Sequence, residues 1–441
     1  MAAPAPRNEH VVLIGGGSTS ALAAVRLAER GFRVTVLEKA AIGNGSSSRS
    51  AAGIRAQFSV AETAIGMRYS EWYYTHFHDL LRTPADQAQP VIHQNGYLFL
   101  YEEADAAAPA WRPEQRRAVA AAWDGARALA ALHQRIGLPV EVLAPATIRD
   151  RWPHLATERL AGATWCPEDG FLAPHMIYGE GFRRAAELGV TVRQRVEVLG
   201  ATLRGGRIAS LETSEGPVAG DWFVNAANAW APRVSQRIGG MRLPITPIKR
   251  YLYFLRVTRP IMPSEAWERL PMTIYGLGAG RGLHTRPDGP QLLIAKSHAA
   301  APEPDFTDAD QDRIDPAFDH AHGIENYGYA LLEELAGFAP DLADCGGIAA
   351  TTSGFYGVTP DATPVIGVDA QQPNLVHAAG FSGHGLMHAP ITALLVEAII
   401  AGDARDGRVQ LPVPFADHSI ALAAFDPARD FTRSAGESQV L

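Results

Sequence analysis

The sequence predicts an α/β fold with a mainly parallel sheet, a β-meander, and a second, mostly antiparallel sheet accompanied by helices. Near the N-terminus, an apolar run (Val11–Ile14) passes through glycines into a helical pattern and then a second apolar run (Arg33–Leu37). Uninterrupted apolar runs of this length are typical of parallel strands buried on both faces. Farther along, residues 243–257 and 282–298 alternate apolar and polar side chains, which is typical of antiparallel strands.

Length and composition restrict the class of protein. The chain has 441 residues, 47% of them hydrophobic, so we expect more than one domain. The net charge of −8 argues against a nucleic-acid partner. Cys166 and Cys345 are the two cysteines, so we expect neither a disulfide framework nor a metal site. The sequence shows no apolar run suited to a bilayer and no signal peptide, which favours a cytoplasmic protein without membrane insertion.

The first strand, its glycine turn and the following helix form a Rossmann-type dinucleotide-binding unit. Gly15 supplies the tight turn, and Gly17 lets a pyrophosphate approach backbone N–H groups at the positive end of the helix. Glu38 ends the second strand, where a carboxylate accepts hydrogen bonds from the adenosine ribose. The third glycine of the pattern is replaced by Ser20, which is still small. The alternative is a glycine-rich turn in an ordinary α/β protein.

The loop after Glu38, residues 40–59, is rich in small and hydroxyl side chains and contains Arg49 and Arg55. We interpret it as a segment that wraps a large flat cofactor, with the arginines bringing charge to that cofactor or to a substrate. The alternative is a solvated loop. The pattern then predicts a helix, a strand, a long helix and a short helix over residues 60–81, 96–103, 113–136 and 143–152.

Later segments return the chain to the first sheet. Residues 165–192 read as loop, helix, glycine and strand, and residues 193–228 as a meander that covers one face of the nucleotide-binding sheet. The acidic stretch 305–315 is expected at the surface. Near the C-terminus, a strand, the turn Gly380–Gly385 and a helix repeat the earlier theme, so a second helix start faces an anion.

Several motifs together resemble the D-amino-acid-oxidase type of FAD-dependent amine oxidoreductase over nearly the whole chain. They are IGGG with Glu38-Lys39, SRSAAGIRAQF (48–58), VNAANAWA (224–231), TPDATPVIG (359–367) and GFSGHG (380–385). Within this family the chain looks closest to the catalytic subunit of dye-linked L-proline dehydrogenases, and more distantly to sarcosine oxidase, dimethylglycine dehydrogenase and glycine oxidase.

The resemblance implies extended FAD, held by residues from every motif. At the pyrophosphate and adenosine it implies Gly15, Gly17, Ser18, Thr19, Ser20, Glu38, Lys39, Val198, Ala227 and Trp230. Along the middle and at the flavin it implies Ser46, Ser47, Ser48, Arg49, Ala52, Gly53, Gly354, Gly383, His384, Gly385, Leu386 and Met387. Sarcosine oxidases attach flavin through a cysteine where Gly354 stands, and dimethylglycine dehydrogenases through a histidine where Ser50 stands, so we expect non-covalent FAD.

By the same resemblance, the catalytic candidates are Arg55, Tyr253, Lys296, His384 and Met387. Arg55 is a candidate clamp for a substrate carboxylate, and the alternative is a charge that supports the flavin loop. Met387 replaces a carboxylate-binding lysine of sarcosine oxidases, while Lys296 lies near the position of their oxygen-activating lysine. Other polar residues on segments expected near the pocket are Tyr251, His284, His298 and His388.

The implied reaction is oxidation of the C–N bond of a small secondary, N-methyl or cyclic amino acid to an imine, by hydride transfer to flavin N5. Oxygen or another electron acceptor takes the electrons, and the oligomeric state stays open. The alternatives are oxidation of a D-amino acid or a 2-hydroxy acid, and a non-catalytic flavin-binding partner subunit. We expect the FAD domain in residues 9–90, 151–230 and 343–441, and the substrate domain in residues 91–150 and 231–342.

Overall fold

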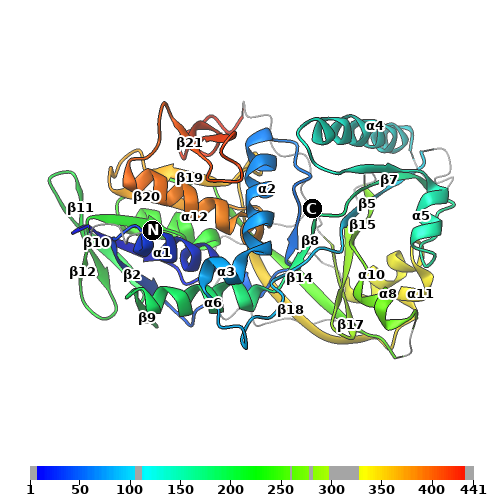
Figure 1. The fold of residues 1–441 in the computed structure, drawn as a ribbon, viewed down its shortest axis with the longest axis horizontal. Helices are drawn as coiled ribbons and strands as arrows, with labels where there is room; N and C mark the ends of the chain where they lie inside the picture. Colours follow the sequence, from blue (N-terminus) through cyan, green and yellow to red (C-terminus); the bar gives the residue numbers. More distant parts are fainter. Residues whose placement is uncertain (1–6, 105–111, 259–260, 278–281, 297–326, 433–441) are drawn as a thin grey trace.

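The computed structural model describes residues 7–104, 112–258, 261–277, 282–296 and 327–432. It has two halves, each built on its own sheet (Figure 1). The predicted acidic stretch 305–315 and His298 lie outside the described residues. Within them, no helix has both the length and the apolar character needed to cross a membrane.

The first half contains a six-stranded sheet with β1 (His10–Ile14) near its centre. Its strand order is β19 (Val365–Val368), β20 (Leu375–Ala379), β13 (Trp222–Asn225), β1, β2 (Arg33–Glu38) and β9 (Thr191–Gln194). Neighbouring strands are parallel except β19 and β20. The predicted parallel sheet is therefore confirmed, and its strands come from both ends of the chain.

Helices and the meander cover opposite faces of this sheet. Leu13 and Val36 share one core with α1 (Ser18–Glu29), α6 (Pro174–Glu187) and α12 (Gly385–Ala401), and α2 (Ala61–Thr75) packs against α12. Val12 belongs to the core on the other face, which the predicted meander covers. The meander strands are β10 (Val198–Arg204), β11 (Arg207–Thr213) and β12 (Val218–Ala219).

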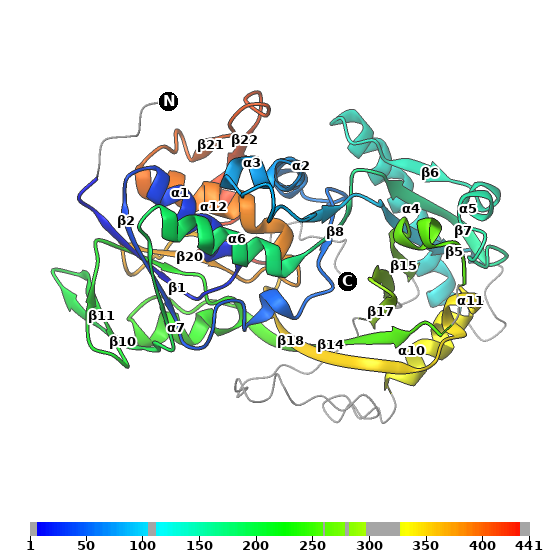
Figure 2. The same cartoon turned by 60° about the horizontal axis from the view of Figure 1, so that its bottom comes forward.

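The second half is built on an eight-stranded sheet that is antiparallel except where β5 and β15 meet. Its order is β18 (Ile348–Val358), β14 (Thr246–Arg256), β17 (Gln291–Lys296), β16 (Leu283–Asp288), β15 (Met272–Leu277), β5 (Tyr97–Glu102), β7 (Leu160–Cys166) and β6 (Glu141–Leu143). The long strands β14 and β18 extend from this sheet toward the first half (Figure 2).

Alternation along these strands separates two cores. Tyr253 and Ile294 face the core that includes α10 (Tyr327–Ala336), whereas Leu252 and Leu293 face the opposite core. That opposite core contains Ala51, Tyr97 and Met272, and α4 (Pro113–Arg135) covers its outer part.

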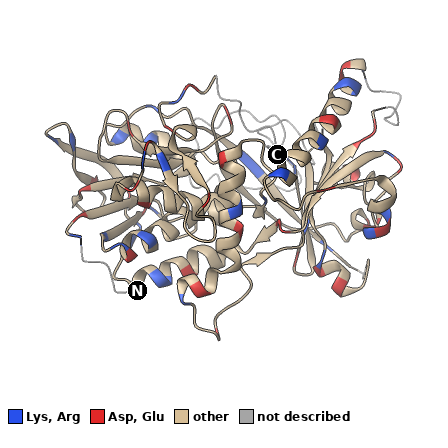
Figure 3. Ribbon diagram, turned by 45° about the horizontal axis from the view of Figure 1, so that its top comes forward, with Lys and Arg blue, Asp and Glu red and all other residues tan. Residues whose placement is uncertain are grey.

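Shorter elements complete the two halves and the region between them. They are α3 (Phe77–Leu81), α5 (Pro145–Arg151), α7 (Ala231–Arg237), α8 (Ser264–Glu268), α11 (Pro340–Ala343), β3 (Gly53–Ile54), β4 (Ile92–His93), β8 (Gly170–Leu172), β21 (Arg408–Gln410) and β22 (Ser419–Ala421). The helix expected over 60–81 is divided into α2 and α3 because His76 leaves the helical conformation, with φ −107° and ψ 16°. The outer helices carry basic and acidic side chains together (Figure 3).

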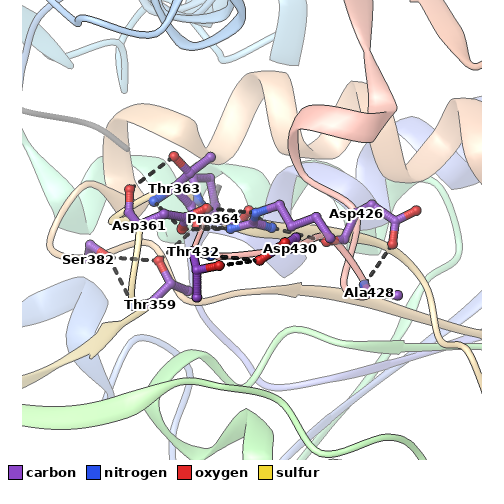
Figure 4. A network of polar contacts seen from close by, with 10 residues as sticks. Thr359, Asp361, Thr363, Pro364, Ser382, Asp426, Ala428, Asp430 and Thr432 are labelled. Carbon is purple, nitrogen blue, oxygen red and sulfur yellow. Dashed lines mark hydrogen bonds and ion pairs between the residues drawn. The ribbon is translucent and has the colours of Figure 1, made fainter. Parts of the chain in front are cut away.

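A polar network fastens the C-terminal segment to the TPDATP turn (Figure 4). The Arg429 guanidinium forms a two-pronged ion pair with Asp361, with Nε–Oδ2 and Nη2–Oδ1 distances of 2.9 Å. Nη2 also donates to the Thr363 carbonyl at 2.6 Å, and Nη1 to the Pro364 carbonyl at 3.1 Å. Both charged side chains are buried, at 8% and 1% exposure, so water does not replace these contacts.

We expect Arg429→Ala to lower the free energy of unfolding by about 3 kcal/mol, because a buried carboxylate loses its ion-pair partner. The measurement is denaturant unfolding of the flavin-loaded protein. Arg405→Ala, which removes an exposed arginine, is the control and is expected to stay within about 0.5 kcal/mol of wild type. Equal stabilities for the two variants would contradict the importance of the ion pair.

Candidate functional site

A large cavity opens at the carboxyl ends of β1 and β2. It has a volume of about 1000 Å³ including its opening to solvent. Its walls come from the predicted glycine turn, the end of β2, the start of β10 and the residues after β13. Carboxyl ends of parallel strands are where α/β sheets bind nucleotides, so the location fits the prediction.

The glycine turn is held in place by close backbone contacts. Gly15 has φ +109°, and a Cβ atom there would lie 2.9 Å from the Ala226 carbonyl oxygen. The Gly16 N–H donates to Glu38 Oε2 at 2.6 Å, and the Ala40 N–H donates to Oε1 at 2.8 Å. The Glu38 carboxylate is thereby fixed at the edge of the cavity, where it can accept hydrogen bonds from ribose hydroxyl groups.

The start of α1 is suited to a phosphate. It has no acidic residue in its first turn, so its positive end is not neutralised locally. The Ser18 N–H donates to Ser47 Oγ at 3.1 Å. The Oγ atoms of Ser18 and Ser20 are buried and have no hydrogen-bond partner among the described residues. These donors fit the pyrophosphate of a dinucleotide such as FAD, whose phosphate oxygens would satisfy them.

A second, narrower cavity of about 390 Å³, including its mouth, lies between the two sheets. It is lined by Ser50, Ala51, Ala52, Gly53, Tyr97, Met272, His284, Tyr356, Ser382, Gly383, His384 and Met387. None of these lining residues is acidic. Gly383, with φ +92°, permits this arrangement, since a Cβ atom there would lie 2.4 Å from the Tyr356 ring.

Arg55 lies behind this cavity and is fully buried, at 0% exposure. Its guanidinium carbon is 4.0 Å from the centre of the Phe58 ring. Nη1 donates to the Gln57 carbonyl, and Nη2 is 3.5 Å from Nε2 of His384, which lines the cavity. A buried guanidinium in this position attracts a carboxylate strongly, because solvent does not screen it.

The histidines at the site are neutral near pH 7. Burial, the Arg55 charge and His388 lower the pKa of His384 well below its ordinary value. Burial lowers the pKa of His388 to about 4 and that of His284 to about 4. His284 Nδ1 lies 3.1 Å from the Gly282 carbonyl, which only accepts, so its Nδ1 carries the proton and its Nε2 keeps a lone pair.

The structure brings most predicted cofactor-binding residues to one or the other cavity. The first is lined by Gly15, Gly17, Glu38, Lys39, Ser46, Val198, Ala227 and Trp230, and the second by Ala52, Gly53, Gly383, His384 and Met387. The remaining ones are Ser18, Thr19 and Ser20 in the first turn of α1, Ser47, Ser48 and Arg49 in the segment that joins the cavities, Gly354 against Arg49, and Gly385 and Leu386 at the start of α12.

The structure does not place the predicted catalytic residues Tyr253 and Lys296 among those that line the second cavity. Tyr253 points into the core beneath α10, with its ring centre 6.2 Å from that of Tyr327. Lys296 Nζ forms an ion pair with Glu334 of α10 at 2.7 Å. Successive side chains of a strand point to opposite faces, and both residues occupy the face turned away from the cavity.

Sequence reasoning missed other residues at the cavities. Asn44, Arg233 and Arg237 line the first, and Tyr97, Met272 and Tyr356 line the second. The alternation of side chains along a strand could have identified Tyr356, which lies two residues after Gly354 on β18 and so shares its face. His284 was noted on a nearby segment and does line the second cavity.

Known proteins are similar to this chain in sequence and in fold. The family model for FAD dependent oxidoreductases (DAO) matches residues 10–399. A glycine oxidase of Geobacillus kaustophilus is 27% identical over 395 residues, covering 88% of this chain and 92% of the relative. The crystal structure of L-proline dehydrogenase from P. horikoshii superposes with a TM-score of 0.74 at 24% identity, covering 96% of this chain and 98% of that one.

A D-amino acid dehydrogenase of Agrobacterium fabrum is also similar, with 27% identity over 269 residues, covering 60% of this chain and 58% of the relative. The family match spans both cavities and the segment between them. The chain therefore belongs to the DAO family of FAD-dependent oxidoreductases, and it is an FAD-dependent amine or amino-acid oxidoreductase that acts on C–N bonds.

Proposed function

We propose that this protein oxidises a small secondary amino acid, sarcosine-like or proline-like, to the corresponding imine. The observation that carries the proposal is Arg55, a desolvated guanidinium beside a cavity without acidic lining residues. A carboxylate is the group that such a charge selects. The names of the relatives, glycine oxidase and L-proline dehydrogenase, support a small amino acid as substrate.

In this proposal each side chain has a stated task. Arg55 holds the substrate carboxylate, and the neutral His284 offers Nε2 as an acceptor to the substrate amine. Gly383 and His384 precede α12 and Gly385 and Leu386 begin it, and this segment would place the positive end of the helix near the negative charge of the reduced flavin. Bound FAD supplies the hydride acceptor. The narrow cavity limits water near the reacting carbon.

We further propose that FAD is bound without a covalent link. A side chain at position 354 would collide with Arg49, because a Cβ atom there would lie 2.8 Å from Arg49 Cβ and 3.0 Å from its carbonyl oxygen. Only glycine therefore fits without a clash at position 354, where a flavin-linking cysteine would stand. Precipitation with acid should release all of the flavin into the supernatant.

The electron acceptor is proposed to be other than oxygen. On β17 the side chains of Leu293 and Ala295 face the core beside the second cavity, while Lys296 faces the opposite way. Within the described part of β17, no ammonium group is thus directed toward that cavity. Oxidation of 2-hydroxy acids remains the second candidate, because the Arg55 carboxylate clamp serves either substrate class.

The purified protein should be yellow, and an anaerobic panel of substrates should separate the candidate reactions. We expect sarcosine or proline to bleach the visible flavin band, since hydride transfer reduces the ring. Glycolate and lactate test the hydroxy-acid alternative, and D-alanine tests the D-amino-acid alternative. Bleaching by none of the amines would contradict the proposal and favour a non-catalytic flavin-binding subunit.

Arg55→Lys keeps a positive charge but removes the planar fork that binds both carboxylate oxygens. We expect KM for the amino acid to rise about thirtyfold, which corresponds to about 2 kcal/mol for a lost charge-assisted hydrogen bond. Steady-state kinetics with a dye acceptor measure this change. Turnover of the matching amine without a carboxylate is the control and should change little. An unchanged KM at full flavin content would reject the clamp.

A further inference from the structure

A pair of carboxylic acids is buried behind the loop that presents Arg55. Asp169 lies in the turn between β7 and β8 and is 0% exposed, and Glu71 lies on α2 and is 5% exposed. The two carboxyl groups lie close enough for each to shift the pKa of the other. Neither residue belongs to the cavities described above.

Asp169 binds the backbone directly after Arg55. Its Oδ1 accepts the Ala56 N–H at 2.9 Å, and its Oδ2 accepts Gln57 Nε2 at 2.8 Å. The carbonyl of the same Gln57 accepts Nη1 of Arg55. The Asp169 carboxyl group therefore fixes the short segment that fixes the guanidinium, from an element more than a hundred residues away in sequence.

Burial favours the protonated form of both acids. Burial, the charge of Asp169 and the hydrogen bond to Asp169 raise the pKa of Glu71 well above its ordinary value. Burial also raises the pKa of Asp169, but hydrogen bonds from Glu71, Gln57 and Ala56 and the Arg55 charge oppose this. Glu71 Oε1 has no hydrogen-bond partner among the described residues, which a neutral acid tolerates better than a carboxylate.

The charged groups around the two acids agree with a neutral Glu71 and an ionised Asp169. Arg55 on the loop and Arg68 on α2 act as cations on the pair, and Glu168 adds a negative charge from the exposed side. Cys166 on β7 stays a thiol because burial and the charge of Asp169 raise its pKa. Two negative charges so close together in a buried group would repel each other, which favours keeping one proton, on Glu71.

We propose that Asp169 is a positioning residue for Arg55, with its carboxylate ionised, and that Glu71 is the protonated acid that donates to it. This inference rests on the proposed function in one respect, because the kinetic consequence requires Arg55 to hold the substrate carboxylate. The arrangement of the proton between the two acids does not depend on any substrate.

Asp169→Asn keeps the shape but places an amide N–H₂ opposite Gln57 Nε2, so two donors face each other. We expect KM for the amino acid to rise about tenfold, with kcat within about twofold and flavin content unchanged. Glu168→Gln, which removes the same charge one residue away on the exposed side, is the control and should leave KM unchanged.

The double variant Asp169→Asn with Gln57→Glu exchanges the amide and the carboxylate. Glu at position 57 accepts the N–H₂ of Asn at position 169, while Oδ1 of that Asn still accepts the Ala56 N–H. We expect this pair to recover most of the lost affinity. Failure to recover, with both variants folded and loaded with flavin, would overturn the positioning role.

Glu71→Gln tests the proton independently of activity. A raised folded-state pKa gives stability that is present below the ordinary value of 4.5 and is lost as pH rises through the folded value. Glutamine carries no proton to lose, so the melting temperature of the variant minus that of wild type should increase from pH 5 to pH 9. A pH-independent difference would overturn the shared proton.

The two tests separate the proposals. If Arg55→Lys leaves KM unchanged while the Glu71→Gln difference rises with pH, the carboxylate clamp fails and the shared proton stands. If Arg55→Lys raises KM while Asp169→Asn does not, the clamp stands and the positioning role of Asp169 fails.

Discussion

The close backbone approach between Gly15 and Ala226 is the constraint on which the nucleotide site depends. It joins the carboxyl ends of β1 and β13 so tightly that a side chain at Gly15 would meet the Ala226 carbonyl. Because this space is kept free, the start of α1 faces the cavity with its N–H groups and hydroxyls available. The Glu38 carboxylate completes the turn by accepting the Gly16 N–H.

The second cavity depends on the buried positive charge of Arg55 and on the absence of acidic side chains among the residues that line it. Arg55 is stacked on Phe58 and held by the Gln57 carbonyl, and the nearby histidines remain neutral. The buried Asp169 carboxyl group binds the loop backbone just after Arg55 and is not among the residues that line the cavity. A carboxylate entering the cavity therefore lies near a buried cation whose charge solvent screens little.

The sequence was most informative where the requirement is local. A glycine turn between a buried strand and a helix, and a carboxylate ending the next strand, determine their own geometry, and these predictions agree with the structure. Tyr253 and Lys296 show the limit, because which face a strand residue takes depends on its register with distant partners. Asp169 gave no signal, since its partners Ala56 and Gln57 lie far away in the sequence.

The order of strands in the parallel sheet has a consequence for synthesis on the ribosome. β1 pairs with β13, and β13 pairs with β20, so the sheet cannot close until residues up to Ala379 have left the exit tunnel. The Arg429 ion pair forms later still. The parallel sheet of the nascent chain is therefore incomplete through most of translation. Its strand edges and apolar surface are exposed during that time, so we expect chaperones to bind it.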